Sequence, residues 1–103
     1  MASSKGYLDF IMEQLSELEE ISSRKMMGEY IIYYRGKIIG GIYDDRFLVK
    51  DTESAREMIP DAVRELPYDG AKEMLLVRNL KDRNYLRRLA EAMYEDLPAP
   101  KRK

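Results

Sequence analysis

Two segments near the ends of the chain repeat their hydrophobic residues every three or four positions, which is the period of an amphipathic helix. The first runs from about Ser4 to Glu20, and the second runs from about Asp82 to Leu97. The apolar stripes are Leu8, Ile11, Leu15 and Leu18 in the first segment, and Leu86, Leu89, Met93 and Leu97 in the second. The pattern therefore predicts a helix at each end of the fold.

Between these helices the hydrophobic period changes to two, which is typical of strands. Three strands are predicted, over Arg24–Tyr34, Lys37–Tyr43 and Arg46–Lys50. Arg35-Gly36 supplies the glycine that a tight hairpin turn favours, and Asp44-Asp45 makes the next turn. Gly28 leaves two alternatives open for the first strand, one bent strand or two strand pieces. Residues 21–23 are predicted to be the connection from the helix.

The second half of the chain predicts a short helix over residues 51–59, a short strand over Leu66–Tyr68 and another strand over Lys72–Arg78. Pro60 either ends this helix or kinks a longer one, and residues 62–66 could extend a helix or start an edge strand. Asp69-Gly70 predicts the turn between the two strands. The order of elements is α-β(3)-α-β(2)-α, an α+β fold with an antiparallel sheet and flanking helices. We expect a single domain over residues 1–97, followed by a disordered basic tail over residues 98–103.

Both faces of the predicted sheet carry apolar side chains, so neither has the polar character of a solvent-exposed face. Strict alternation places Tyr30, Ile32 and Tyr34 on one side of the first strand, and Ile31 and Tyr33 on the other. In the next strand, alternation separates Ile38 and Ile42 from Ile39 and Tyr43. Either helices cover both faces in a fully internal core, or one face binds a second copy of the chain. We predict a homodimer.

Composition narrows the classes of function. The 103 residues include 45% hydrophobic and 36% charged residues, which is enough apolar material for one core. The chain has neither cysteine nor histidine. The absence of cysteine excludes disulfides and thiol nucleophiles. The absence of histidine removes the commonest general base, and the two absences together remove the commonest zinc ligands. This makes catalysis an unfavoured interpretation, and we expect no catalytic residues, no metal and no cofactor.

The net charge of −1 gives no overall basic field of the kind that marks nucleic-acid-binding proteins. Charge is nevertheless unevenly distributed, with net +3 over residues 24–50 and over residues 81–103. These are either solvated faces that pair with acidic segments or a modest basic surface. The N-terminal residues have polar or charged positions every few residues, so we expect no signal peptide, no membrane contact and a cytoplasmic location.

A pattern of arginine, methionine, glycine, tyrosine, aspartate and lysine positions runs through the segment from Ile21 to Lys50. Its members are Arg24, Met26, Met27, Gly28, Tyr30, Gly36, Asp44, Leu48 and Lys50, with Tyr68-Asp69-Gly70 as a second anchor. These positions match or nearly match the typical signature of the N-terminal domain of the TfoX/Sxy family, which the segment resembles. Met27 replaces the usual phenylalanine, and Glu29 replaces a second glycine. The resemblance implies a secretion-chaperone-like topology, pairing as dimers and, for full-length members, regulation of bacterial competence genes. We expect a stand-alone domain without the second, helical domain of those regulators.

The favoured function is a non-enzymatic binding domain, possibly in competence-type transcriptional regulation, that contacts an unidentified protein partner. Its candidate binding or dimer residues are Tyr30, Tyr33, Tyr34 and Tyr43 with Arg24, Lys25, Arg35 and Lys37. The simpler interpretation of the tyrosines is core and interface packing. The alternative function is direct nucleic-acid binding through the strand cations, helped by Arg83, Arg87 and Arg88. A metal site at Asp44-Asp45 with Asp51 or Glu53 is less favoured than ordinary turn chemistry.

Overall fold

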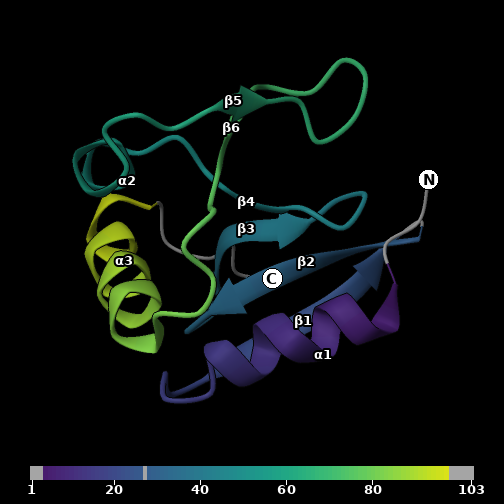
Figure 1. Cartoon of the computed structure of the whole chain (residues 1–103), viewed down its shortest axis with the longest axis horizontal. Coiled ribbons are helices and arrows are strands. Elements are labelled where there is room, and N and C mark those ends of the chain that lie inside the picture. Colours follow the sequence, from purple (N-terminus) through teal and green to yellow (C-terminus); the bar gives the residue numbers. More distant parts are fainter. Residues whose placement is uncertain (1–3, 27, 98–103) are drawn as a thin grey trace.

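The computed structural model describes residues 4–26 and 28–97, which include six antiparallel strands and three helices (Figure 1). The helices are α1 (Lys5–Gln14), α2 (Glu53–Met58) and α3 (Arg83–Asp96). The strands are β1 (Ile21–Met26), β2 (Glu29–Tyr34), β3 (Lys37–Ile42), β4 (Phe47–Val49), β5 (Arg64–Glu65) and β6 (Met74–Leu76). They form one sheet in the order β1-β2-β3-β4-β6-β5. The predicted α+β class is confirmed, and the tail predicted over 98–103 lies outside the described residues.

The first predicted strand is two antiparallel strands, β1 and β2, which Gly28 helps to separate with a φ of 86°. Of the two alternatives for this segment, the structure therefore has the two strand pieces. The connection predicted over residues 21–23 is wrong, because these residues belong to β1 and pair with Tyr34, Tyr33 and Ile32. A ladder is built from backbone N–H and C=O groups, so the polar side chains of two serines do not prevent pairing.

The helix α1 is capped at Ser4, whose side chain accepts a hydrogen bond from the Tyr7 backbone N–H, but it ends at Gln14 rather than at Glu20. The chain continues in tighter turns, in which the Leu18 N–H donates to the Leu15 carbonyl at 3.0 Å. Both leucines remain buried. The apolar stripe therefore identified the residues that reach the core but overestimated the length of the helix.

The hairpin predicted at Arg35-Gly36 is confirmed, and both residues have positive φ, 52° and 82°. This is the type I′ geometry, whose twist matches that of the flanking strands. The short strand predicted over Leu66–Tyr68 is wrong, because the strand that pairs with β6 is Arg64–Glu65. Pro67 has no N–H to donate to a neighbouring strand, which is consistent with pairing that ends before it.

A β-bulge in β3 changes which isoleucines reach the core. Tyr33 pairs with Ile38 and Ile32 pairs with Gly40, so Ile39 is an extra residue with no partner of its own. The bulge turns Ile39 to the same side as Ile42, and both are buried. The predicted alternation, which separated these two residues, is wrong beyond this point.

One hydrophobic core joins the three helices to one face of the sheet. The strands contribute Tyr30, Ile32, Tyr34, Ile39, Ile42, Phe47, Val49 and Leu75, and the helices contribute Leu8, Ile11, Ala55, Leu86, Leu89, Ala90 and Met93. Figure 1 shows α2 and α3 grouped at the left of the view and α1, in purple, at the bottom. The helices are thus on one side, and the described residues place no helix on the other face of the sheet.

Candidate functional site

We call the sheet face away from the helices the open face. The strand register identifies its residues, because directly paired residues point to the same side of a sheet. The open face consists of Ser22, Arg24, Met26, Glu29, Ile31, Tyr33, Ile38, Gly41, Tyr43, Leu48, Met74 and Leu76. Most of these side chains are apolar. Ile31, Tyr33, Ile38 and Leu76 are all partly exposed to solvent. A sheet face that meets water is usually polar, so this apolar face is a candidate for contact with another molecule.

The aromatic ring of Tyr43 lies over Gly41 on the open face. A Cβ atom at Gly41 would be 2.6 Å from the Tyr30 carbonyl oxygen, 2.7 Å from Cε2 of Tyr43 and 2.8 Å from its hydroxyl oxygen. A larger residue would therefore shift the Tyr43 ring and press against the backbone of β2. Next to Gly41 in the sheet is Leu48, which is fully buried although the core cluster does not include it. The absence of a side chain at Gly41 therefore leaves space for the Tyr43 ring against the sheet.

Tyrosine side chains gather at this end of the open face. The rings of Tyr43 and Tyr68 are 6.3 Å apart, and Tyr68 is 64% exposed. Burial raises the pKa of the Tyr43 hydroxyl, and the neighbouring Tyr68, Glu29 and Tyr33 raise it further. The Tyr43 hydroxyl therefore stays protonated at neutral pH. The two rings offer aromatic area to a partner, with hydroxyl groups that can form hydrogen bonds.

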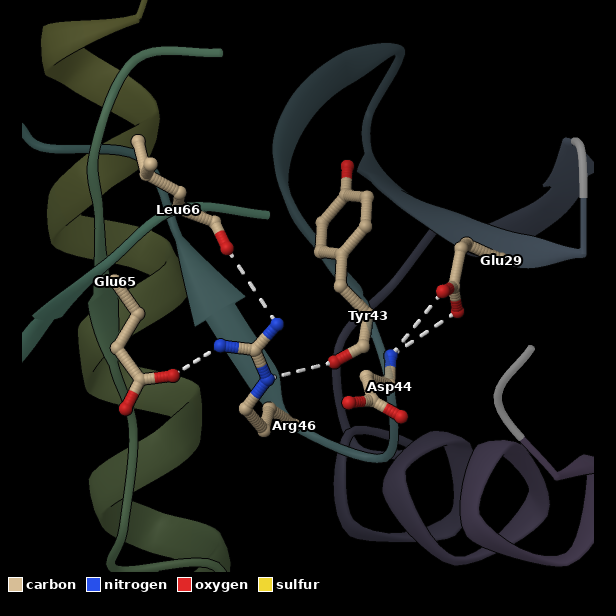
Figure 2. Close-up of polar contacts among 6 residues, drawn as sticks. All are labelled: Glu29, Tyr43, Asp44, Arg46, Glu65 and Leu66. Carbon is tan, nitrogen blue, oxygen red and sulfur yellow. Dashed lines mark hydrogen bonds and ion pairs between the residues drawn. The ribbon is translucent and has the colours of Figure 1, made fainter. Parts of the chain in front are cut away.

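Figure 2 shows how Arg46 fixes this corner of the sheet. Its Nε donates to the Tyr43 carbonyl at 3.0 Å, one terminal nitrogen pairs with the Glu65 carboxylate, and the other donates to the Leu66 carbonyl at 3.5 Å. The guanidinium thus links the turn between β3 and β4 to β5. Both Arg46 and Glu65 have side chains that are only 29% exposed, so water screens their interaction incompletely.

The turn between β3 and β4 is held from the other side by Glu29. Its carboxylate oxygens accept from the Asp44 backbone N–H at 3.2 and 3.3 Å, as Figure 2 also shows. Asp44 and Asp45 both have positive φ, 54° and 55°, which aspartate tolerates better than most residues. The two adjacent aspartates therefore form a hairpin turn of the same kind as Arg35-Gly36.

Two of the tyrosines proposed from the sequence, Tyr30 and Tyr34, belong to the core rather than to the open face. Tyr34 forms a second group with Tyr94 of α3, in an edge-to-face arrangement with ring centroids 5.5 Å apart. Lys37 donates from Nζ to the Tyr94 carbonyl at 2.8 Å and lies 3.8 Å from the centre of its ring. Arg35 lies 5.7 Å from the Tyr34 ring and pairs with Glu19 at 3.6 Å.

The structure thus divides the eight candidate residues. Arg24, Tyr33 and Tyr43 share the open face, whereas Tyr34, Arg35 and Lys37 gather beside α3. Sequence reasoning missed Tyr68 and Tyr94 as members of these groups. The sequence pattern places Tyr68 in the short strand predicted over Leu66–Tyr68, and no local signal pairs it with Tyr43, which directly follows β3.

The basic residues considered for nucleic-acid binding are not gathered on one surface. Arg83 of α3 lies 3.3 Å from the Glu13 carboxylate, and Arg87 lies 4.0 Å from that of Glu17, so both pair with α1. With Arg35 and Lys37 also in contact with neighbouring groups, the cations of α3 and of the β2–β3 hairpin do not extend the basic surface of β1.

The acidic residues considered for a metal site have other positions. Asp51 binds Arg56 at 2.7 Å and also pairs with Arg64, and the hydrogen bond from Arg64 is the main reason that the pKa of Asp51 is lowered. In residues 4–26 and 28–97, no group of three or more acidic side chains is placed to hold a metal ion. Beside this cluster, an open depression of about 120 Å³ is lined by Arg56, Ile59, Pro60, Ala62, Arg64 and Leu75.

Within the same described ranges, no helix is both long enough and apolar enough to cross a membrane.

Comparison with known proteins identifies one family and one similar protein. Residues 13–98 match the TfoX N-terminal domain. An uncharacterized 12.7 kDa protein in the trpE 5′ region of Spirochaeta aurantia is 31% identical over 106 residues, covering 98% of this chain and 89% of the relative. No solved structure matches the chain.

Proposed function

Because the chain belongs to the TfoX N-terminal domain family, we propose that it is a non-enzymatic protein-binding domain that forms a homodimer through its open face and acts in transcriptional regulation. The observation that carries this proposal is the apolar open face. Burying a fully exposed apolar side chain is worth about 1.5–3 kcal/mol, so each partly exposed side chain of this face would gain a fraction of that on contact with a partner. A second copy presents the same apolar face, and contact between two such faces buries both.

The regulatory part of the proposal rests on the family. Full-length relatives of this domain are linked to control of competence genes, and a domain that acts there without its own chemistry does so by binding. The side chains that the open face presents to a partner are mainly tyrosines and branched aliphatic residues. Tyrosine in particular is enriched at protein interfaces and among the residues that contribute most to binding. Arg24 provides a charged margin on the β1 side.

The oligomeric state tests the proposal directly. We expect multi-angle light scattering to give twice the chain mass of 12.1 kDa for the wild-type protein. Ile31→Lys places a charge in the middle of the open face and is expected to give a folded monomer. Arg88→Glu, an exposed charge reversal on α3, is the matched control and is expected to remain dimeric.

A wild-type monomer at several hundred micromolar would refute the dimer, as would an Ile31→Lys variant that stays dimeric. For the regulatory role, cross-linking in the native host with mass spectrometry is expected to recover a component of the transcription machinery with the wild-type protein and to lose it with Ile31→Lys. Recovery of the same partner by both proteins would show that the open face does not bind it.

A further inference from the structure

The strand β1 forms an unpaired edge of the sheet. Within the described residues it pairs with β2 alone, and five of its six residues are exposed. The strand at the opposite edge, β5, has only two residues. A long exposed edge offers a row of backbone donors and acceptors to which an extended peptide can add as a further strand.

The register identifies which backbone groups face outward. The Arg35 N–H donates to the Glu20 carbonyl at 3.0 Å, so the pair that precedes β1 is a hydrogen-bonded one. Hydrogen-bonded and non-hydrogen-bonded pairs alternate along an antiparallel ladder. The N–H and C=O groups of Ile21, Ser23 and Lys25 therefore point away from β2, toward the free edge.

The charges on β1 select among the segments that could add there. Arg24 and Lys25 are consecutive, so they point to opposite faces of the sheet, and both are exposed. No ion pair with a carboxylate joins either side chain to another residue of the described chain. Ser22 and Ser23 are small, so they do not obstruct an approaching strand. Two copies of β1 would bring like charges together, which disfavours self-pairing.

We propose that β1 binds an extended acidic segment of another protein, which adds to the sheet as a further strand beside β1. The outward N–H and C=O groups of Ser23 and Lys25 pair with its backbone, and two consecutive acidic residues of the segment meet Arg24 and Lys25, one on each face. This goes beyond the proposed function, because it concerns the edge of the sheet and not the open face, and it does not depend on dimerisation.

The test is a titration of the ¹⁵N-labelled full chain followed by heteronuclear NMR. The probe is an eight-residue peptide of alternating valine and threonine with two central glutamates, and the matched control peptide has two central lysines. With the glutamate peptide at up to about 1 mM, we expect shifts along β1 and slower amide exchange at Ser23 and Lys25. We expect the lysine peptide to bind about tenfold more weakly or not at all.

Two variants separate the backbone from the charge. Ser23→Pro removes a backbone N–H that points away from β2, so no hydrogen bond to β2 is lost. Proline is tolerated on an edge strand, and this variant is expected to abolish peptide binding. The double variant Arg24→Glu with Lys25→Glu is expected to reverse the preference between the two peptides. Circular dichroism establishes that each variant is folded.

The proposal is wrong if the glutamate peptide causes no shifts along β1, or if both peptides bind wild-type protein equally. Shifts at Ile31, Tyr33 and Leu76 without slowed exchange at Ser23 would place binding on the open face instead. Binding of a single-stranded oligonucleotide that is tighter than that of the glutamate peptide would identify phosphate as the preferred ligand and overturn it too. An Ile31→Lys monomer that still binds the glutamate peptide would separate this result from the fate of the dimer.

Discussion

Replacing Gly40 by alanine tests how closely β3 and β4 approach in the middle of the sheet. A Cβ atom at this position would lie 2.1 Å from the Leu48 carbonyl oxygen and 2.8 Å from the Val49 Cα. Both are backbone atoms of the paired strand, so no side-chain rotation relieves the contact. Gly40 has no positive φ, and the expected penalty is therefore steric rather than conformational.

The size of the effect follows from two opposing terms. Overpacking a well-filled site costs typically about 1–3 kcal/mol, and contacts this short with backbone belong at the upper end. Alanine restricts the unfolded chain and returns about 0.4–1 kcal/mol. The net loss is about 2 kcal/mol, from a total stability of about 5–15 kcal/mol for a domain of this size.

Urea denaturation followed by circular dichroism measures this loss. With a slope of about 2 kcal/mol per molar, the midpoint of Gly40→Ala is expected to fall by about 1 M. Gly6→Ala is the matched control, because nothing lies within 4 Å of a Cβ atom there and the residue is in α1, where alanine is favoured by up to about 1 kcal/mol. A Gly40→Ala midpoint within 0.2 M of the wild type, about 0.4 kcal/mol at this slope, would refute the close approach of the two strands.

Three further changes have defined expectations. Ile32→Ala removes a fully buried side chain and is expected to lower the free energy of unfolding, measured by urea denaturation, by about 2–5 kcal/mol. Ile31→Ala, on the partly exposed open face, is expected to cost less than about half as much. Equal losses would contradict the assignment of the two residues to opposite faces. Arg46→Ala breaks the link from the β3–β4 turn to β5 and is expected to lower the free energy of unfolding by about 1–2 kcal/mol. Arg46→Lys is expected to restore only part of this stability, because lysine lacks the planar guanidinium that makes the three contacts. Full restoration by lysine would show that charge alone matters. The pKa of Asp51 is lowered in the folded protein, so the stabilising effect of its charge is complete above the ordinary pKa of 3.8 and is lost as the pH falls through the lower pKa of the folded state. Asp51→Asn should therefore flatten the dependence of the urea midpoint on pH below about 4. An unchanged pH profile in this variant would contradict the assignment.

The candidate site could be predicted only in part from the sequence. The apolar character of both sheet faces left two possibilities, helices on both sides or a second copy of the chain on one side. Tyr33, Tyr43 and Arg24 were among the candidate residues named. Tyr30 and Tyr34 carry the same kind of local pattern, but they face the helices. Which side of β2 the helices cover depends on contacts with α1 and α3, residues far away in the chain, and no local pattern records it.

By itself, the sequence determined the elements whose causes are local. The Arg35-Gly36 hairpin depends on two adjacent residues that adopt positive φ, and α3 depends on its apolar stripe and its Asp82 cap, whose side chain accepts from the Tyr85 N–H. Only the tertiary structure decided the bulge at Ile39, the strand identity of Ser22 and Ser23, and the exposure of the β1 edge. These features arise because backbone pairing and core packing join distant segments, and those energies exceed the small local preferences of individual residues.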